Sequence, residues 1–131
     1  SYIFTIGYEG ASIEAVLSEL QRREIDMLID VRLIPLSRKK GFSKTALSNN
    51  LRSIGISYLH MRSLGCPSII RNRYREDGDW DIYTKNYKDY LATQEQEITS
   101  LLPTVETKNA VFYALNAILT SAIVNTLRNA W

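Results

Sequence analysis

The order of apolar runs and amphipathic segments at the start of the chain constrains the fold more than any other feature. Residues 2–6 (YIFTI) and 27–31 (MLIDV) are almost continuously apolar and of strand length, a pattern typical of strands buried on both faces. Between them, residues 13–20 carry apolar side chains at helical spacing, and Ser12 can cap the start of that helix. A strand, a helix and a buried strand in this order predict a right-handed βαβ unit with parallel strands.

The same alternation continues to the end of the chain. We expect two further strands, over residues 56–60 and 110–115, and a helix between Ser43 and Gly55. Three more helices are expected in the second half, over residues 83–91, 93–102 and 118–127. Residues 65–81 are polar and contain Pro67 and Gly78, which predicts a long functional or mobile loop. The sequence therefore predicts one α/β domain over residues 1–131, with three layers: a mostly parallel sheet of about four strands and helices on both of its faces.

The charges are distributed unevenly along this predicted fold. The net charge is only +2, yet the segment from Val31 to Arg75 contains ten Lys or Arg residues and no Asp or Glu. The densest part is RLIPLSRKKGFSK, residues 32–44. Such a segment is either a solvated face or a surface for a negatively charged partner, and its length without one acid favours the partner.

The expected binding site lies at the carboxyl ends of the strands, where open parallel sheets bind their ligands. Seven residues follow or end the first three strands, or belong to the loop after the second: Tyr8, Glu9, Arg32, Ser37, Arg38, Lys39 and His60. Arginine can hold a phosphate through two hydrogen bonds, and the backbone amides near Ser43 can add others. We therefore expect this site to bind a phosphate-bearing ligand or nucleic acid.

Several alternatives remain open at this stage. Asp30 and Arg32 can form a structural ion pair beneath the loop, and His60 can be a hydrogen-bonded structural residue instead of a catalyst. An enzyme acting on a nucleotide or another phosphorylated small molecule would use Glu9, Asp30 or His60 as its acid or base. A third alternative is a protein-interaction module whose basic loop docks an acidic partner.

Cysteine and histidine content limits the other chemistry. One cysteine, Cys66, and one histidine, His60, cannot supply the usual four ligands of a structural zinc site, so we expect no metal and no cofactor. A single cysteine also excludes an internal disulfide and favours a reducing compartment. Since the N-terminus lacks a basic leader before an apolar run, and the apolar C-terminal segment is interrupted by polar residues, we expect a cytoplasmic chain without membrane contact. The oligomeric state does not follow from the sequence.

Four segments resemble, in order and spacing, a family of bacterial and archaeal proteins. They are TIGYEG, LIDVRLIPLSRKKGFSKTAL, GISYLH and LGCPSIIR, and the most specific series within them is DVR-x-x-P-x-SR-x-x-GF, residues 30–42. In these segments the chain resembles the DUF488 family, a domain of unknown function. The resemblance implies an α/β domain in which Arg32, Ser37 and Arg38 line a pocket, and it carries no established activity.

The C-terminal part departs from that family pattern. Family members typically end with a strand containing Cys-x-Glu, followed by Cys-His-Arg at the start of the last helix. Here the corresponding strand contains VFYALNA, with Ala114 and Asn116 nearest to the Cys and Glu positions, and no Cys, His or acid follows Lys108. The chain is then either a degenerate member or one whose function depends on the basic segment alone.

Overall fold

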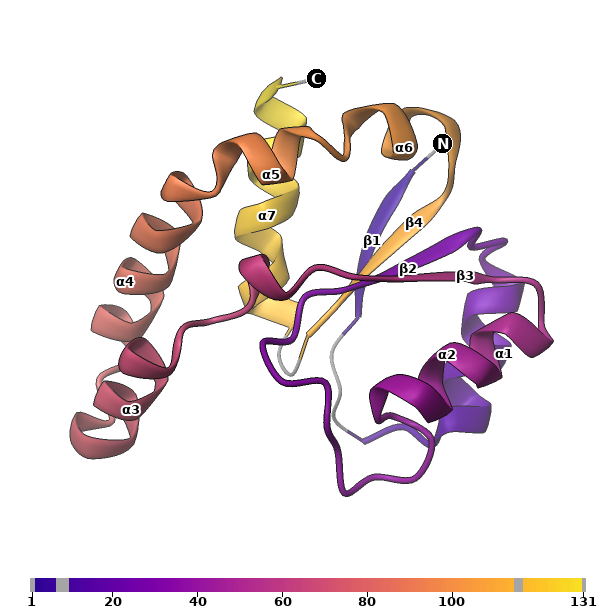
Figure 1. Cartoon of the computed structure of the whole chain (residues 1–131), viewed down its shortest axis with the longest axis horizontal. Helices are drawn as coiled ribbons and strands as arrows, with labels where there is room; N and C mark the ends of the chain where they lie inside the picture. Colours follow the sequence, from indigo (N-terminus) through magenta and orange to yellow (C-terminus); the bar gives the residue numbers. More distant parts are fainter. Residues whose placement is uncertain (1, 7–9, 115–116, 131) are drawn as a thin grey trace.

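A parallel four-stranded sheet forms the centre of the computed structural model, which describes residues 2–6, 10–114 and 117–130. The strands are β1 (Ile3–Ile6), β2 (Met27–Asp30), β3 (Ser57–His60) and β4 (Ala110–Tyr113), in the spatial order β1-β4-β2-β3 (Figure 1). All three pairings are parallel, which confirms the predicted sheet. The last strand of the sequence lies between the first two, a position that no local pattern specifies.

Two helices cover one face of the sheet, α1 (Ile13–Arg22) and α2 (Lys44–Ser53). The crossovers from β1 to β2 and from β2 to β3 move in the same direction across the sheet, and right-handed connections place both helices on the same face. Leu20 of α1 and Leu47 of α2 pack there in one buried cluster with Leu28 and Val111 of the sheet. The predicted cap of α1 is confirmed, because the Ser12 hydroxyl accepts a hydrogen bond from the Ala15 amide at 3.1 Å.

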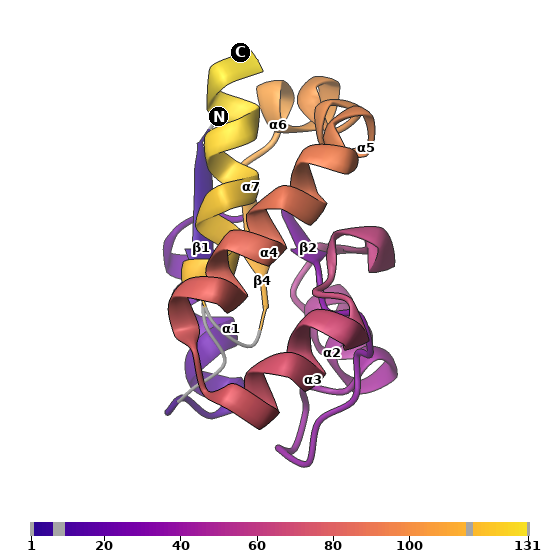
Figure 2. The same cartoon turned by 90° about the vertical axis from the view of Figure 1, so that its left-hand side faces the viewer.

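The opposite face is covered by the segments that bring the chain back from β3 to β4 and by the final helix. They are α4 (Trp80–Thr93), α5 (Glu95–Thr99), α6 (Leu102–Thr107) and α7 (Ala117–Ala130). Ile29 and Phe112 of the sheet are fully buried in this layer, together with Ile98 and Leu127. Figure 2 shows α4 and α7 adjacent on this side, and the two helices are in contact. The predicted three-layer α/β fold is therefore confirmed.

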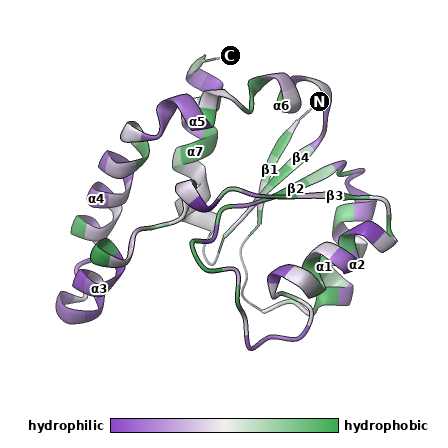
Figure 3. Cartoon of the chain, viewed as in Figure 1, coloured by the Kyte–Doolittle hydropathy of each residue, from purple (hydrophilic) through white to green (hydrophobic). Residues whose placement is uncertain are grey.

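The prediction of a long loop over residues 65–81 is wrong. After a 3₁₀ turn at Arg62–Leu64, the chain forms α3 (Ser68–Asp77), which Gly78 ends with a left-handed φ of 62°. Figure 3 shows why sequence patterning missed it: α3 is mostly hydrophilic, whereas β1, β2 and β4 are mostly hydrophobic. Its partly buried Ile70 and Tyr74 pack against the core, and α3 lies against α4, so tertiary contacts stabilise a helix of weak amphipathic pattern.

Two boundaries in the second half also differ from the sequence prediction. Thr93 ends α4 and does not begin the next helix, and two short helices, α5 and α6, replace the single helix expected over residues 93–102. Within the ranges that the structure describes, no helix combines the length and the apolar character needed to cross a bilayer.

Candidate functional site

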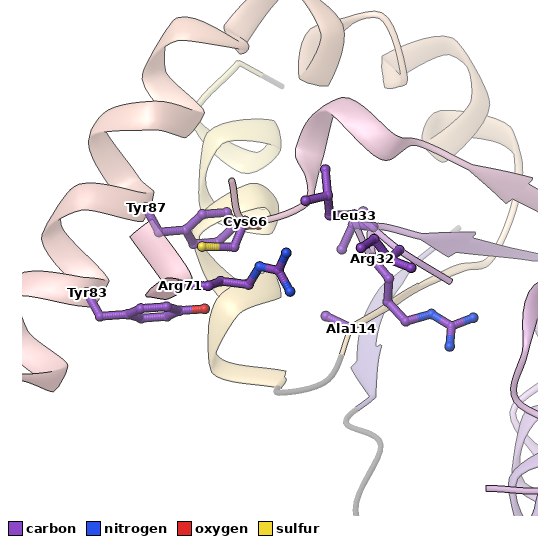
Figure 4. Close-up of a pocket in the computed structure, with 9 residues that line it drawn as sticks. Arg32, Leu33, Cys66, Arg71, Tyr83, Tyr87 and Ala114 are labelled. Carbon is purple, nitrogen blue, oxygen red and sulfur yellow. The ribbon is translucent and has the colours of Figure 1, made fainter. Parts of the chain in front are cut away.

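The carboxyl ends of β2 and β4 meet at the centre of the sheet, and there the chain leaves toward opposite faces. From β2 it continues to α2, whereas from β4 it continues to α7 on the other side. In open parallel sheets such a divergence creates the crevice that binds ligands. A pocket of about 60 Å³ lies at this point, and we call it the switch pocket; its lining residues are Val31, Arg32, Leu33, Ile34, Cys66, Arg71, Tyr83, Tyr87 and Ala114 (Figure 4).

Arg32 is part of a buried ion pair at the end of β2. Its Nε and Nη2 donate to the two carboxylate oxygens of Asp30 at 2.9 and 2.8 Å, and the Tyr58 hydroxyl donates to the same carboxylate at 2.6 Å. Asp30 is fully buried, and Arg32 is 4% exposed, with its guanidinium 4.8 Å from the centre of the Tyr113 ring. Burial acts to lower the pKa of Arg32, but the hydrogen bonds and charge of Asp30 outweigh it and raise that pKa.

Asp30 thus holds two of the three guanidinium nitrogens of Arg32, while Nη1 is buried and has no hydrogen-bond partner in the described part of the chain. In Figure 4 the Arg32 side chain points away from Cys66, Arg71 and Tyr83, so only part of the residue borders the switch pocket. His60 supports the same turn, because its Nε2 lies 2.7 Å from the carbonyl oxygen of Arg32. Of the predicted site residues, the structure therefore brings Arg32 and His60 together beside Asp30, and both have structural partners there.

The loop after β2, Leu33–Ser43, is called the basic loop below, and hydrogen bonds near its two ends fix its shape. The Ser37 amide donates to the Ser43 hydroxyl at 2.9 Å, and that hydroxyl donates back to the Ser37 carbonyl at 3.1 Å. The Ser37 hydroxyl accepts from the Lys39 amide at 2.9 Å. Ser43 precedes α2 as predicted, but its side chain ties the loop and does not cap the helix. Phe42, 1% exposed, anchors the loop in the core.

The cations of the basic loop and of the first turn of α2 project outward. Arg38, Lys40 and Lys44 are exposed, and none of them lies within ion-pair distance of a carboxylate in the described part of the chain. Lys39 is half-buried, with its ammonium 5.2 Å from the centre of the Phe42 ring. The predicted residues Tyr8 and Glu9 lie outside the described residues. The predicted site thus separates into a buried support around Arg32 and an exposed set of cations.

The opposite wall of the switch pocket comes from α3 and α4, and no residue of this wall belongs to the site predicted from the sequence. Arg71 of α3 points into the pocket in Figure 4; its Nη2 donates to the Ser68 hydroxyl at 3.2 Å, and its Nε is buried with no partner among the described residues. The Tyr83 ring of α4 lies beside it, and its hydroxyl points toward the same space. The sequence predicted a loop over residues 65–81, so Arg71 was not expected to face a pocket. The segment LGCPSIIR, which ends at Arg71 and resembles the family, was the signal that could have indicated it.

Cys66 borders the same pocket but is poorly suited to act as a nucleophile. Burial raises the pKa of its thiol, and the interaction with Tyr83 and the charge of Arg71 only partly oppose that shift. The residue is 8% exposed, and its Sγ lies 3.8 Å from the Pro67 carbonyl oxygen. A protonated, buried thiol packs as a small apolar group.

A comparison with models of protein families gives one match. Residues 12–117 match the family described as domain of unknown function DUF488, which is more than half of the chain. No curated protein and no solved structure shows significant similarity to the chain. Ala114, which lies nearest to the expected Cys position of the family's strand motif, lines the switch pocket, while Asn116 lies outside the described residues. The match covers both the basic loop and the wall formed by α3 and α4, and the chain therefore belongs to the DUF488 family.

Proposed function

We propose that this domain binds a phosphate-bearing ligand through the basic loop, with nucleic acid as the most general candidate. The observation that carries the proposal is the display of Arg38 and Lys40 on an anchored loop and of Lys44 at the start of α2, without a carboxylate in ion-pair distance in the described part of the chain. When cations that are not neutralised within the protein meet nucleic-acid phosphates, the counterions condensed on those phosphates are released, which favours binding.

The construction of the loop supports this function. The Ser37 and Ser43 hydrogen bonds and the buried Phe42 hold the backbone, so little conformational entropy is lost when a ligand binds. Arg32 and His60 act beneath the loop as positioning residues, because the Arg32 carbonyl is held by His60 and its side chain by Asp30. Ligand contacts are then made by Arg38, by Lys39 and by the neighbouring Lys40.

The geometry favours binding over catalysis. Asp30 is occupied by Arg32 and Tyr58, and His60 is hydrogen-bonded to the backbone. An enzyme acting on a phosphorylated molecule needs an acid or base within reach of the substrate. Two of the three candidate groups, Asp30 and His60, thus serve the fold, and the third, Glu9, lies outside the described residues. The described part of the structure therefore supports a binding module more than the enzyme alternative.

Thermal unfolding with added ligands tests the proposal. Inorganic phosphate, a mononucleotide and a short single-stranded oligonucleotide are added at low and moderate salt to the wild type, Arg38→Ala, Lys44→Ala and Lys88→Ala. A ligand that binds only the folded state raises Tm. We expect Arg38→Ala to abolish the increase, Lys44→Ala to reduce it slightly, and Lys88→Ala, an exposed site on α4, to leave it unchanged.

The salt dependence identifies the class of ligand. Many phosphate contacts give a steep loss of affinity with salt, and each removed contact lowers the slope by about one unit, whereas a small phosphorylated molecule gives a shallow dependence. Equal ligand-induced shifts of Tm in the wild type and in Arg38→Ala would contradict the proposed function.

A further inference from the structure

The switch pocket contains an unpaired guanidinium donor facing a largely apolar space. Nε of Arg71 is buried and has no hydrogen-bond partner among the described residues, although buried donors are nearly always paired. Leaving such a donor unsatisfied costs the free energy of its lost hydration. An acceptor placed in the pocket would restore that hydrogen bond.

The charges around the pocket define the kind of acceptor that fits. Arg32 is neutralised by Asp30, whereas no carboxylate of the described ranges lies within ion-pair distance of Arg71. The wall opposite Arg71 is apolar, formed in part by Leu33 and Ala114. A single uncompensated positive charge in such surroundings matches one negative charge, since a dianion would keep a second, unpaired charge in a poorly hydrated space.

The volume limits the size of the bound group. About 60 Å³ corresponds on this measure to roughly four to six water positions, because each water needs about 10–15 Å³. A carboxylate with one or two carbon atoms attached fits this space. Ile34, which lines the pocket, is 52% exposed, so the remainder of a longer molecule can extend toward solvent there.

We propose that the switch pocket binds a small carboxylate, either as a free acid or as the carboxylate end of a longer molecule. Arg71 Nε donates to one oxygen, and the Tyr83 hydroxyl, which points toward the same space, donates to the other. The carbon chain contacts Leu33 and Ala114. Its two polar contacts, Arg71 and Tyr83, lie outside the basic loop, whose own ligand contacts are Arg38, Lys39 and Lys40, and the pocket prefers a different anion.

Chemical-shift titration tests this site directly. The ¹H–¹⁵N signals of the Arg71 Nε–H and of the Ala114 amide are followed while acetate, propionate or inorganic phosphate replaces chloride at constant ionic strength. We expect saturable shifts with propionate and a Kd on the order of 1 mM, and weaker binding of phosphate. Shifts that do not saturate, or phosphate binding here as tightly as propionate, would overturn the proposal.

Three variants separate the guanidinium from other effects. Arg71→Ala should weaken propionate binding, measured from the Ala114 amide signal, by at least about tenfold, because it removes a hydrogen bond to a charged group. Arg75→Ala makes the same charge change at an exposed site of α3 and should leave the affinity unchanged. Tyr83→Phe keeps the packed ring and should weaken binding by a smaller factor, which provides a test if Arg71→Ala does not fold.

The same variants distinguish this inference from the proposed function. Arg38→Ala should leave propionate binding intact, and Arg71→Ala should leave the Tm increase with oligonucleotide intact. Equal affinity for propionate in the wild type, Arg71→Ala and Tyr83→Phe would overturn the carboxylate site, whatever the basic loop binds.

Discussion

Asp30 and Arg32 form a buried ion pair at the end of β2. Both side chains are almost fully buried and joined by two hydrogen bonds. Sequence placed Arg32 at the carboxyl edge of β2 correctly, but its orientation depends on Asp30, on Tyr58 of β3 and on Tyr113 of β4. Those contacts are long-range, so the sequence left both the structural and the ligand-binding interpretation of Arg32 open.

Removing one member of this pair should strongly destabilise the protein. Arg32→Ala leaves the Asp30 carboxylate buried without its main partner, and we expect a loss of about 3–5 kcal/mol in the free energy of unfolding, measured with urea. The double variant Asp30→Asn, Arg32→Met should lose less, because no charge remains buried. Arg73→Ala, which breaks the exposed pair with Asp77, serves as the control and should change stability little. A loss for Arg32→Ala no larger than that of the control would contradict the structural role.

Cys66 should react slowly with alkylating reagents in the folded protein. Its raised pKa keeps the thiol protonated at neutral pH, and the residue is buried. We expect the rate of alkylation by iodoacetamide to increase with pH only above the range of an ordinary thiol. The urea-unfolded chain is the control and should follow an ordinary thiol profile. Rapid stoichiometric alkylation of the folded protein at pH 7 would disprove this prediction.

At the scale of secondary structure, local pattern was sufficient where a segment is apolar on its own. The runs that became β2 and β4 are buried on both faces, and their composition alone predicted them. In contrast, α3 is stabilised mainly by packing against α4, and the insertion of β4 between β1 and β2 depends on the whole chain. Arg71 belongs to α3, and because this helix was not predicted, neither was the position of Arg71 in the switch pocket.

Gly41 brings the basic loop close to Ile13 at the start of α1. It has a left-handed φ of 91°, and an added Cβ would lie 2.7 Å from the Cβ of Ile13. Gly55 has a similar φ of 79° but open space around it. Both Gly→Ala variants introduce backbone strain, and we expect Gly41→Ala to lower the free energy of unfolding further because Ile13 must also move. Urea unfolding measures the difference, and equal losses would show that the contact with Ile13 is unimportant.

At the scale of the whole molecule, the topology places the switch pocket and the basic loop next to the end of β2. Residues 31–34 leave the strand, line the switch pocket and lead into the basic loop. Gly65 lies so close to this segment that an added Cβ would be 2.4 Å from the Leu33 amide nitrogen. The turn before α3 and the start of the basic loop are therefore packed backbone against backbone, which fixes the pocket and the loop relative to each other.

Alkaline pH should destabilise this fold because several acidic groups are buried in their neutral form. Burial raises the pKa of Cys66, and it also raises the pKa of Tyr83 and of Tyr87, whose hydroxyl donates to the Leu64 carbonyl. Above the ordinary pKa of each group the unfolded chain loses its proton while the folded chain keeps it. The folded state then binds more protons, so the free energy of unfolding falls as pH rises, by at most about 1.4 kcal/mol per pH unit and group.

Guanidinium chloride unfolding between pH 7 and pH 11 measures this effect in the whole protein. We expect a nearly constant free energy of unfolding up to the ordinary thiol pKa and a progressive decline above it, steeper once tyrosines of the unfolded chain ionise. Tyr87→Phe removes one of these protons and should reduce the slope at high pH, although it also loses the hydrogen bond to Leu64 at every pH. Comparing this variant with the wild type at pH 7 gives the cost of the lost hydrogen bond by itself, so the change in slope at high pH reports the proton. A free energy of unfolding that does not fall at high pH would mean that these groups ionise in the folded state, in which case the layer around α4 admits water.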